Sequence, residues 1–468
     1  MVHKYRLFDT NIVIDINCNA VYELDDAAFA VLDAYRSTDD NDGPHHQDDT
    51  SDNEVVFEQN VFYKLRQRFA QQDLDGAKDE IDSMIEAGAL FAKPVSSEDL
   101  NGLAQTQVLK SMCLHVAHSC NMTCEYCFAS CGDFGMKQEL MPFETAKRAI
   151  DFITDASGGR RNIEIDFFGG EPLLNFDVVQ KTVAYARSIE ADKQKNFRFT
   201  MTTNGTLLDS GKIQYINENM DNLVLSLDGR KTVNDRLRKM RNGSGSYDAA
   251  VPFFQEAVQN RGDKSYYLRG TYTAYNKDFS NDVLHLADLG FQHVSVEPVV
   301  SPTDQRMEFS DADMADVLRE YESLALAMEE RNRKGKGFHF FHFNVDLTQG
   351  PCLARRLKGC GAGCEYVAVA PNGDIYPCHQ FVGNDAFLLG NLETGITNEK
   401  VVVDFMGATL NNKPLCQKCW AKYFCSGGCA ANSYHYNQDI MVPNPFYCAL
   451  LKKRMECAVW LKTREAPV

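Results

Sequence analysis

Three cysteines stand close together in one short stretch of the chain. Cys120, Cys124 and Cys127 follow one another at the spacing C-x3-C-x2-C, within the segment MCLHVAHSCNMTCEYCFASCGDFG of residues 112–135. Three thiolates on one loop can ligate three irons of a cubane [4Fe-4S] cluster, which leaves the fourth iron open to another ligand. The alternative is a zinc knuckle or a disulfide, but zinc sites require four ligands and usually contain C-x2-C pairs. The spacing therefore favours a cluster with one iron free for chemistry.

The elements around this loop must position it. From residue 113 onward, short β-type runs alternate with amphipathic helical stretches. Strands are expected at residues 113–118, 163–168, 197–203, 222–227, 267–273 and 293–299, and helices at 143–156, 177–189, 247–260 and 281–289. This α/β alternation predicts parallel strands joined by right-handed crossovers, and hence an open or partial barrel. Functional side chains are then expected where the strands end.

The cysteine loop, with the aromatic Tyr126 directly before its third cysteine, resembles the signature of radical S-adenosylmethionine (SAM) enzymes. In that family the open iron binds the amino and carboxylate groups of SAM. The reduced cluster then cleaves SAM to methionine and a 5′-deoxyadenosyl radical. The resemblance implies that Cys120, Cys124 and Cys127 are the catalytic cluster ligands and that Tyr126 belongs to the cofactor-binding loop. It also implies a partial (β/α)6 radical SAM barrel over residues 105–310.

The second expected strand ends in Gly169-Gly170-Glu171-Pro172, which matches the GGEP motif of the same family. The match implies that Gly169, Gly170 and Glu171 bind the amino group of SAM, because glycine lets the backbone approach a ligand closely. A simple turn is the alternative when the motif is considered alone. Its place one β/α unit after the cysteine loop favours ligand binding.

Two further motifs lie at the end of the fourth expected strand and in the helix after it. Ser226 and Asp228, in the sequence SLDG, are candidates by position for contacts to the SAM ribose. Arg238, in the sequence NDRLR, resembles the HDxxR element of the family with Asn234 in place of histidine. Its planar guanidinium suits a carboxylate, here that of SAM, whereas an exposed helix arginine is the alternative.

A second group of cysteines lies in residues 351–468, after an expected bridging helix in residues 311–350. The spacing C-x2-C-x5-C-x3-C and its flanking cysteines resemble the SPASM extension of radical SAM maturases, with a zinc ribbon as the alternative. The resemblance implies two auxiliary [4Fe-4S] clusters, and thus three in the chain. The first cluster would use Cys360, Cys378 and Cys429, with Cys364, Cys352 or a substrate thiolate as its fourth ligand. The second cluster would use Cys416, Cys419, Cys425 and Cys448.

Residues 1–93 form an N-terminal unit. A hairpin and a third strand are expected over residues 4–22, with helices at 25–36, 57–71 and 74–87. This pattern resembles the winged-helix-like, RRE-like peptide-recognition domain of peptide maturases, whose edge strand pairs with a leader peptide. A generic α+β domain is the alternative. Residues 39–54 are strongly acidic, contain no lysine, arginine or aromatic residue, and are expected to form a disordered insertion.

Charge and composition exclude several classes of partner. The formal net charge of −17 argues against nucleic-acid binding, which requires a basic face. No run approaches the length of a membrane span and the N-terminus lacks a signal-peptide pattern, so we expect a cytoplasmic protein with no membrane partner. Sixteen cysteines that cluster in so long a chain indicate metal ligation rather than a disulfide framework.

Over nearly its whole length the chain resembles SCIFF-type maturases of cysteine-rich peptides, the thioether-forming ranthipeptide group. The resemblance implies an enzyme that joins cysteine sulfur to carbon in a ribosomally synthesised precursor peptide, bound through its leader, with a flavodoxin or ferredoxin as reductant. Related maturases that form carbon–carbon crosslinks or formylglycine are the nearest alternative. A non-catalytic iron-sulfur electron carrier is a more distant one.

Overall fold

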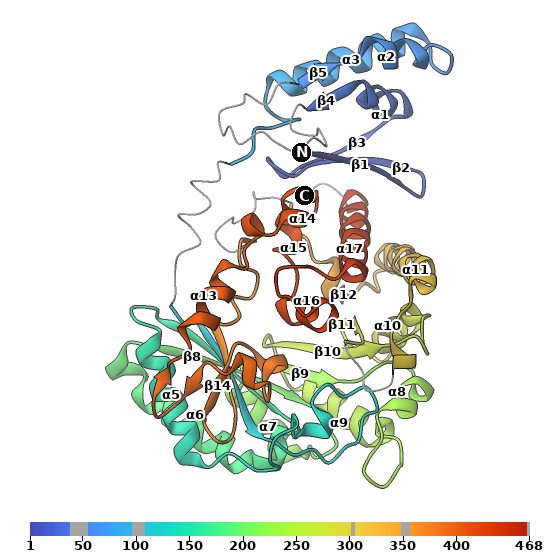
Figure 1. Cartoon of the computed structure of the whole chain (residues 1–468). Helices are drawn as coiled ribbons and strands as arrows, with labels where there is room; N and C mark the ends of the chain where they lie inside the picture. Colours follow the sequence, from blue (N-terminus) through green and yellow to red (C-terminus); the bar gives the residue numbers. More distant parts are fainter. Residues whose placement is uncertain (38–54, 96–107, 301–304, 348–355, 466–468) are drawn as a thin grey trace.

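The computed structural model describes residues 1–37, 55–95, 108–300, 305–347 and 356–465. Its largest feature is an eleven-stranded sheet in the order β12-β11-β10-β9-β8-β7-β6-β13-β14-β15-β16 (Figure 1). The strands from β6 to β11 follow the chain order, and each is parallel to its neighbour. They are β6 (Ser111–Ala117), β7 (Asn162–Gly169), β8 (Asn196–Thr203), β9 (Asn222–Ser226), β10 (Ser265–Tyr272) and β11 (His293–Pro298). This order confirms the predicted partial (β/α)6 barrel.

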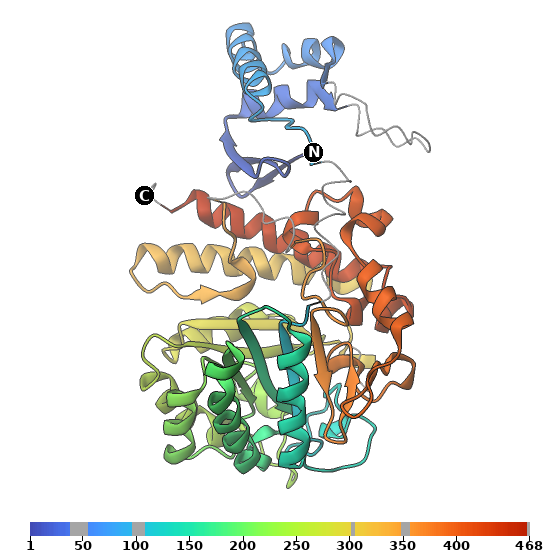
Figure 2. The same cartoon turned by 90° about the vertical axis from the view of Figure 1, so that its left-hand side faces the viewer.

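Helices cover the outer face of these strands (Figure 2). They are α5 (Phe143–Ala156), α6 (Phe176–Lys193), α7 (Ser210–Asn219), α8 (Lys231–Leu237), α9 (Tyr247–Gln259) and α10 (Phe279–Asp288). The strands divide their residues between the two faces, as the pleat requires. On β7, Ile163, Ile165 and Phe167 are fully buried in the core shared with the helices. The alternate residues of β7 therefore face the inside of the barrel.

The C-terminal region continues the same sheet. β13 (Tyr366–Val369) lies parallel to β6 and antiparallel to β14 (Asp374–Tyr376), with Gly373 at φ +93° in the connecting turn. β15 (Gly390–Asn391) and β16 (Gly395–Ile396) complete this edge. The helices that follow are α13 (Glu399–Gly407), α14 (Pro414–Gln417), α15 (Lys422–Cys425), α16 (Ala430–Asn437) and α17 (Pro445–Thr463).

At the opposite edge, the expected bridging helix is only part of what residues 311–350 form. α11 (Met314–Arg333) ends well before residue 350. β12 (His339–Phe340) then joins the sheet parallel to β11. The segment therefore extends the sheet as well as connecting to the C-terminal region.

The N-terminal unit contains a three-stranded antiparallel sheet of β1 (Val2–Leu7), β2 (Thr10–Asp15) and β3 (Ala20–Leu24), as expected. Its helices are α1 (Asp26–Val31), α2 (Gln59–Leu65) and α3 (Gln71–Glu86). The prediction of a helix as far as Arg36 was wrong, because β4 (Tyr35–Ser37) pairs with β5 (Val55–Phe57) in a small sheet. The expected disordered insertion at 39–54 lies outside the described residues.

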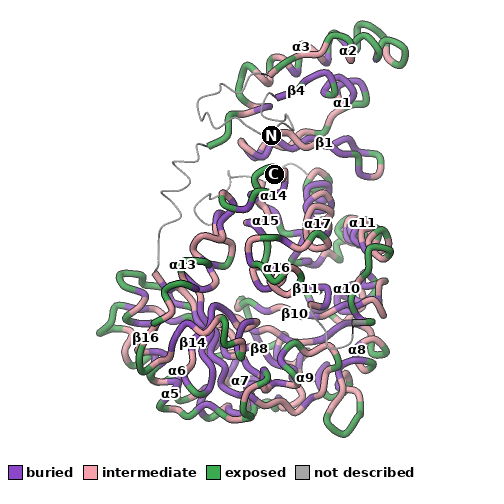
Figure 3. Tube along the Cα trace, in the orientation of Figure 1, coloured by how far each residue is buried: buried purple, intermediate pink, exposed green. Residues whose placement is uncertain are grey.

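This unit packs against the last helix, α17. The Tyr5 hydroxyl donates to the Glu456 carbonyl oxygen at 2.9 Å, and the Trp460 indole N–H donates to Thr10 Oγ1 at 3.3 Å. The ring of His3 stacks on Trp420 with 3.8 Å between ring centroids. Figure 3 shows buried residues concentrated in the sheet and along α17, whereas α2 and α3 are mostly exposed. The small sheet is thus anchored to the C-terminal region and leaves its outer helices at the surface.

None of the helices in the described ranges has the length and apolar character needed to cross a membrane.

Candidate active site

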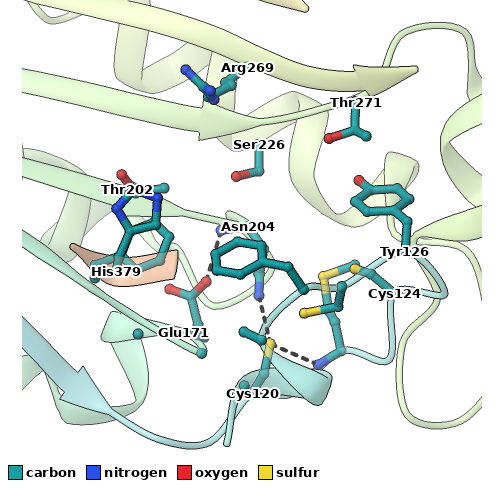
Figure 4. Close-up of a pocket in the computed structure, with 18 of the residues that line it drawn as sticks. Cys120, Cys124, Tyr126, Glu171, Thr202, Asn204, Ser226, Arg269, Thr271 and His379 are labelled. Carbon is teal, nitrogen blue, oxygen red and sulfur yellow. Dashed lines mark hydrogen bonds between the residues drawn. The ribbon is translucent and has the colours of Figure 1, made fainter. Parts of the chain in front are cut away.

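A cavity of about 420 Å³ opens at the carboxyl ends of the barrel strands. The cysteine loop after β6 forms one wall, and strands β7 to β11 form others (Figure 4). His379 and Gln380, from the C-terminal region, close a further side. Of the residues predicted for the SAM site, every one except Asp228 lines this cavity: Cys120, Cys124, Tyr126, Cys127, Gly169, Gly170, Glu171, Ser226 and Arg238.

The three cysteines of the loop are largely shielded from solvent. Burial raises the pKa of Cys120 to about 11 and that of Cys124 to about 12, and it also raises the pKa of Cys127. The Met122 amide and the Asn204 side-chain amide both point at Cys120 Sγ, at 3.4 and 3.8 Å. Buried thiols ionise when a metal centre supplies positive charge. The donor set therefore fits the iron-sulfur cluster that the spacing predicts.

The two glycines of GGEP let the end of β7 approach the cysteine loop. The Gly170 amide donates to the Ala117 carbonyl at 2.7 Å, and the Glu171 amide donates to that of Ser119 at 2.9 Å. A Cβ on Gly170 would lie 2.1 Å from the Ser119 carbonyl oxygen. Gly169 has φ +129°, which disfavours other residues, and a Cβ there would lie 2.2 Å from the Ala117 oxygen. These contacts hold the start of the cysteine loop close to the end of β7.

Glu171 is fully buried and joins the ends of two strands. Its Oε1 accepts hydrogen bonds from the Thr203 hydroxyl at 2.7 Å and the Leu173 amide at 3.1 Å. Its Oε2 accepts one from the Asn204 amide at 2.8 Å. Burial raises the pKa of Glu171 to about 6 despite these donors. Since Oε2 accepts only this bond among the described residues, it retains a lone pair for a ligand amine.

Tyr126 links the cysteine loop to the residues predicted from the SLDG and NDRLR motifs. Its hydroxyl donates to the Asp228 carboxylate, 2.7 Å from Oδ2, and accepts from Arg238 Nη1 at 2.9 Å. Asp228 Oδ1 also accepts from the Thr271 amide at 2.9 Å. Burial raises the pKa of Asp228, and the charge of Arg238 opposes that shift. Arg238 is therefore a buried residue of the site and not an exposed helix arginine.

Members of each predicted group of auxiliary cysteines lie near one another, and their role as cluster ligands stays a prediction. Burial, together with the neighbouring Cys429 and Cys360, raises the pKa of Cys378. In the second group, burial raises the pKa of Cys425 to about 12, and the other members act on it in the same direction: Cys448, Cys416 and Cys419. No three Cys, His, Asp or Glu side chains in the described ranges converge as ligands of a single metal ion.

The candidates for the fourth ligand of the first group differ in position. Cys364 lies beside Cys360, and its thiol donates to the Gly361 carbonyl oxygen at 3.4 Å. Cys352 lies outside the described residues.

Cys448, a member of the second group, lies on α17. The first turn of this helix contains Pro445, and the Asn444 side chain accepts a hydrogen bond from the Phe446 amide at 2.9 Å.

Several cavity residues are not predicted by the motifs. Asp166 of β7, Thr202 of β8, Arg269 and Thr271 of β10, and His379 all line the cavity. Figure 4 shows Arg269 on the side opposite Cys120. Polar residues at alternate positions of otherwise apolar strands, such as Glu164 and Asp166, are the signal that could have found the strand residues.

Comparison with known proteins follows the same division of the chain. The radical SAM superfamily profile matches residues 114–268, and the SPASM profile, described as an iron-sulfur cluster-binding domain, matches residues 360–420. The protein MJ0907 of Methanocaldococcus jannaschii is 35% identical over 138 residues, which are 30% of this chain and 45% of that protein. A cysteine-type anaerobic sulfatase-maturating enzyme of Clostridium novyi is 24% identical over 347 residues, 69% of this chain and 88% of that enzyme.

Two solved structures share the fold. The enzyme anSMEcpe, with bound AdoMet and Cp18Cys peptide, has a TM-score of 0.60 at 20% identity and covers 76% of this chain and 98% of its own. SuiB of Streptococcus suis, bound to its precursor peptide SuiA, has a TM-score of 0.51 at 14% identity and covers 92% of this chain and 94% of its own. The chain therefore combines a radical SAM domain, built on the partial barrel, with a C-terminal SPASM iron-sulfur cluster-binding domain.

Proposed function

We propose that this protein is a radical SAM peptide maturase that installs thioether crosslinks, from cysteine thiols to acceptor carbons, in a ribosomally synthesised precursor peptide. It would hold three [4Fe-4S] clusters and receive electrons from a flavodoxin or ferredoxin. When bound, the cluster at Cys120, Cys124 and Cys127 supplies the electron that cleaves SAM. The same-fold enzymes with bound peptides and the sulfatase-maturating relative support a peptide as substrate.

The observation that carries this proposal is the composition of the cavity. His379 and Gln380 line it and directly follow Cys378, a proposed ligand of the first auxiliary cluster. The loop of Cys120, Cys124 and Cys127 lines the same cavity. A substrate side chain inside it would then lie between the proposed site of radical formation and the proposed first auxiliary cluster. This arrangement allows one cavity to hold both the carbon that loses a hydrogen and the sulfur that replaces it.

The chain's own residues would hold SAM at the cysteine loop. Glu171 Oε2 can accept from the SAM ammonium, and Arg238 can donate to its carboxylate. The Nε atom of Arg238 is buried without a hydrogen-bond partner among the described residues, so this donor remains available to a ligand. Ser226, at the end of β9, would face the ribose. Asp228 would not contact SAM and would orient Tyr126 by accepting a hydrogen bond from its hydroxyl.

The N-terminal sheet would bind the leader of the precursor. β3 is an edge strand of this sheet among the described residues, because the strand order is β1-β2-β3. An extended peptide can add to such an edge through main-chain hydrogen bonds. The opposite edge, β1, contacts α17, so a leader on β3 would be held close to the SPASM domain.

The test is an anaerobic reaction of the reconstituted enzyme with SAM, a strong reductant and a cysteine-rich peptide encoded beside it. We expect release of 5′-deoxyadenosine and a thioether that survives thiol-specific alkylation. Cys124→Ala should abolish both, whereas Cys18→Ala, at an exposed cysteine of the N-terminal unit, should retain both. Persistence of either product in Cys124→Ala would refute the proposal.

A further inference from the structure

Asp166 occupies an unusual position inside the barrel. It lies on the inward face of β7, between Cys113 of β6 and Thr200 of β8 in the strand register, and it lines the cavity. Its Oδ1 atom is buried and has no hydrogen-bond partner within the described part of the chain. A buried polar atom left without a partner is destabilising, so such an atom requires an explanation.

Arg269 of β10 lines the same cavity, and its side chain is exposed to it. Among the described residues, its guanidinium takes part in no hydrogen bond or ion pair, although its charge acts on Asp166. Figure 4 shows Arg269 across the cavity from the cysteine loop. The Asp166 carboxyl group and the Arg269 guanidinium therefore line one cavity without pairing, and a substrate group can lie between them.

The other carboxylates of the site are already engaged. Glu171 accepts three hydrogen bonds, and Asp228 accepts from Tyr126 and from the Thr271 amide. Glu297 is bound by Arg454 at 3.1 Å and lies 3.2 Å from His342. Against the effect of burial, His342, Arg454 and Arg269 lower the pKa of Glu297 to about 2. Asp166 is therefore the carboxylate of the cavity that remains free to accept a proton.

We propose that Asp166 is the catalytic residue that removes the proton from the substrate cysteine, and that Arg269 stabilises the thiolate that results. This inference rests on the proposed thioether function. In this step the S–H bond breaks, its electron pair stays on sulfur, and the proton moves to the Asp166 carboxylate. No oxidant or reductant enters the step.

The environment of Asp166 suits this transfer. Burial raises the pKa of Asp166 to about 7, while the charge of Arg269 opposes the shift and that of Glu164 adds to it. A free cysteine has a pKa of about 8.5, so the transfer is unfavourable by only roughly 30-fold, against more than 10,000-fold for an ordinary aspartate. Arg269 reduces this difference further, since a nearby cation lowers the pKa of a thiol. The titratable and charged groups around Asp166 are Cys113, Glu164, Arg198, Arg269, Tyr366, Glu297 and His379.

Asp166→Asn tests this role, with Glu164→Gln as the matched control on the same face of β7. We expect Asp166→Asn to hold the same iron and to release deoxyadenosine at a near-normal rate. Its thioether yield should fall about 100-fold or more at pH 7, the usual scale for loss of a general base. The deficit should shrink toward pH 9, where the substrate thiol ionises by itself. Glu164→Gln removes only a charge that adds to the raised pKa of Asp166, so its thioether yield at pH 7 should fall by no more than about threefold.

Arg269→Gln provides a second test in case Asp166→Asn does not accumulate as folded protein. Loss of the cation should move the rise of thioether formation to higher pH and leave iron content unchanged. An Asp166→Asn yield within twofold of the wild type at pH 7, or an unchanged pH profile in Arg269→Gln, would overturn the role proposed for Asp166 and Arg269 but not the proposed thioether function. A wild-type enzyme that forms no thioether would overturn the proposed function, and the role of Asp166 with it.

Discussion

Arg454, in the last helix of the chain, donates a hydrogen bond from Nη2 to Oε2 of Glu297 at 3.1 Å. Arg454 is 6% exposed, and it also donates to the Tyr321 hydroxyl from Nε and Nη2. Glu297 is the penultimate residue of β11 and lines the cavity. The pair therefore ties α17, which carries Cys448, directly to the wall of the radical SAM site.

Glu297→Gln should lower the free energy of unfolding by about 3 kcal/mol, because it leaves the buried Arg454 guanidinium without its counter-ion. The pKa of Glu297 is lowered to about 2, so its stabilisation is complete above the unfolded value near 4.5 and is lost only as the pH falls toward 2. Urea unfolding should thus show the same deficit at pH 6 and pH 8.

The double variant Glu297→Gln/Arg454→Met provides the control for this prediction. It removes both charges, so we expect it to be more stable than the sum of the two single changes predicts. Additive effects would show that the two residues act independently.

Tyr126→Phe should weaken SAM binding about tenfold. The change deprives Asp228 of a donor and Arg238 of an acceptor inside a buried network, and hydrogen bonds to charged groups contribute about 1.5–3 kcal/mol. Isothermal titration of the reconstituted protein with SAM measures the effect. Tyr436→Phe, at a tyrosine that is 61% exposed, serves as the control and should bind SAM normally.

Gly170→Ala should prevent normal loading of the SAM-binding cluster. Its new methyl group would lie 2.1 Å from the Ser119 carbonyl oxygen, so the cysteine loop must move away from β7. Gly159→Ala introduces the same methyl group where no atom lies within 4 Å. Iron content and absorbance after reconstitution should separate the two variants, and equal loading would contradict the proposed role of the close approach.

On the proposed function, which assigns three four-iron clusters to the chain, Cys425→Ala should lower the iron content from about twelve to about eight per chain. The SAM-binding loop is separate from this group, so release of deoxyadenosine without peptide should persist. Cys457→Ala, at a buried cysteine outside both auxiliary groups, should retain all the iron. Loss of iron in both variants would argue against the assignment of the second group.

Much of the barrel could be predicted because its local patterns are strong. The helix expected at 143–156 is α5 with the same bounds, and the strand expected at 163–168 lies within β7. Tyr35 was misassigned to a helix because β4 exists only through pairing with β5, a contact between residues far apart in the chain.

The motifs located the cysteine loop and the strand-end residues that line the cavity with it. They did not locate Asp166 and Arg269, which come together only because β7 and β10 curve around one cavity. Likewise, no motif indicates that His379 of the SPASM domain closes the site, since this depends on the pairing of β13 with β6. These relationships are set by sheet register and closure rather than by local sequence.

Mass spectrometry of the reacted peptide tests the central claim most directly. After anaerobic incubation with SAM and reductant, the peptide is alkylated with iodoacetamide and its mass is measured. The proposed function predicts a loss of two hydrogens and of one alkylatable thiol for each bridge, together with deoxyadenosine. A loss of two hydrogens with every thiol still open to alkylation, or deoxyadenosine with no change in peptide mass, would contradict it.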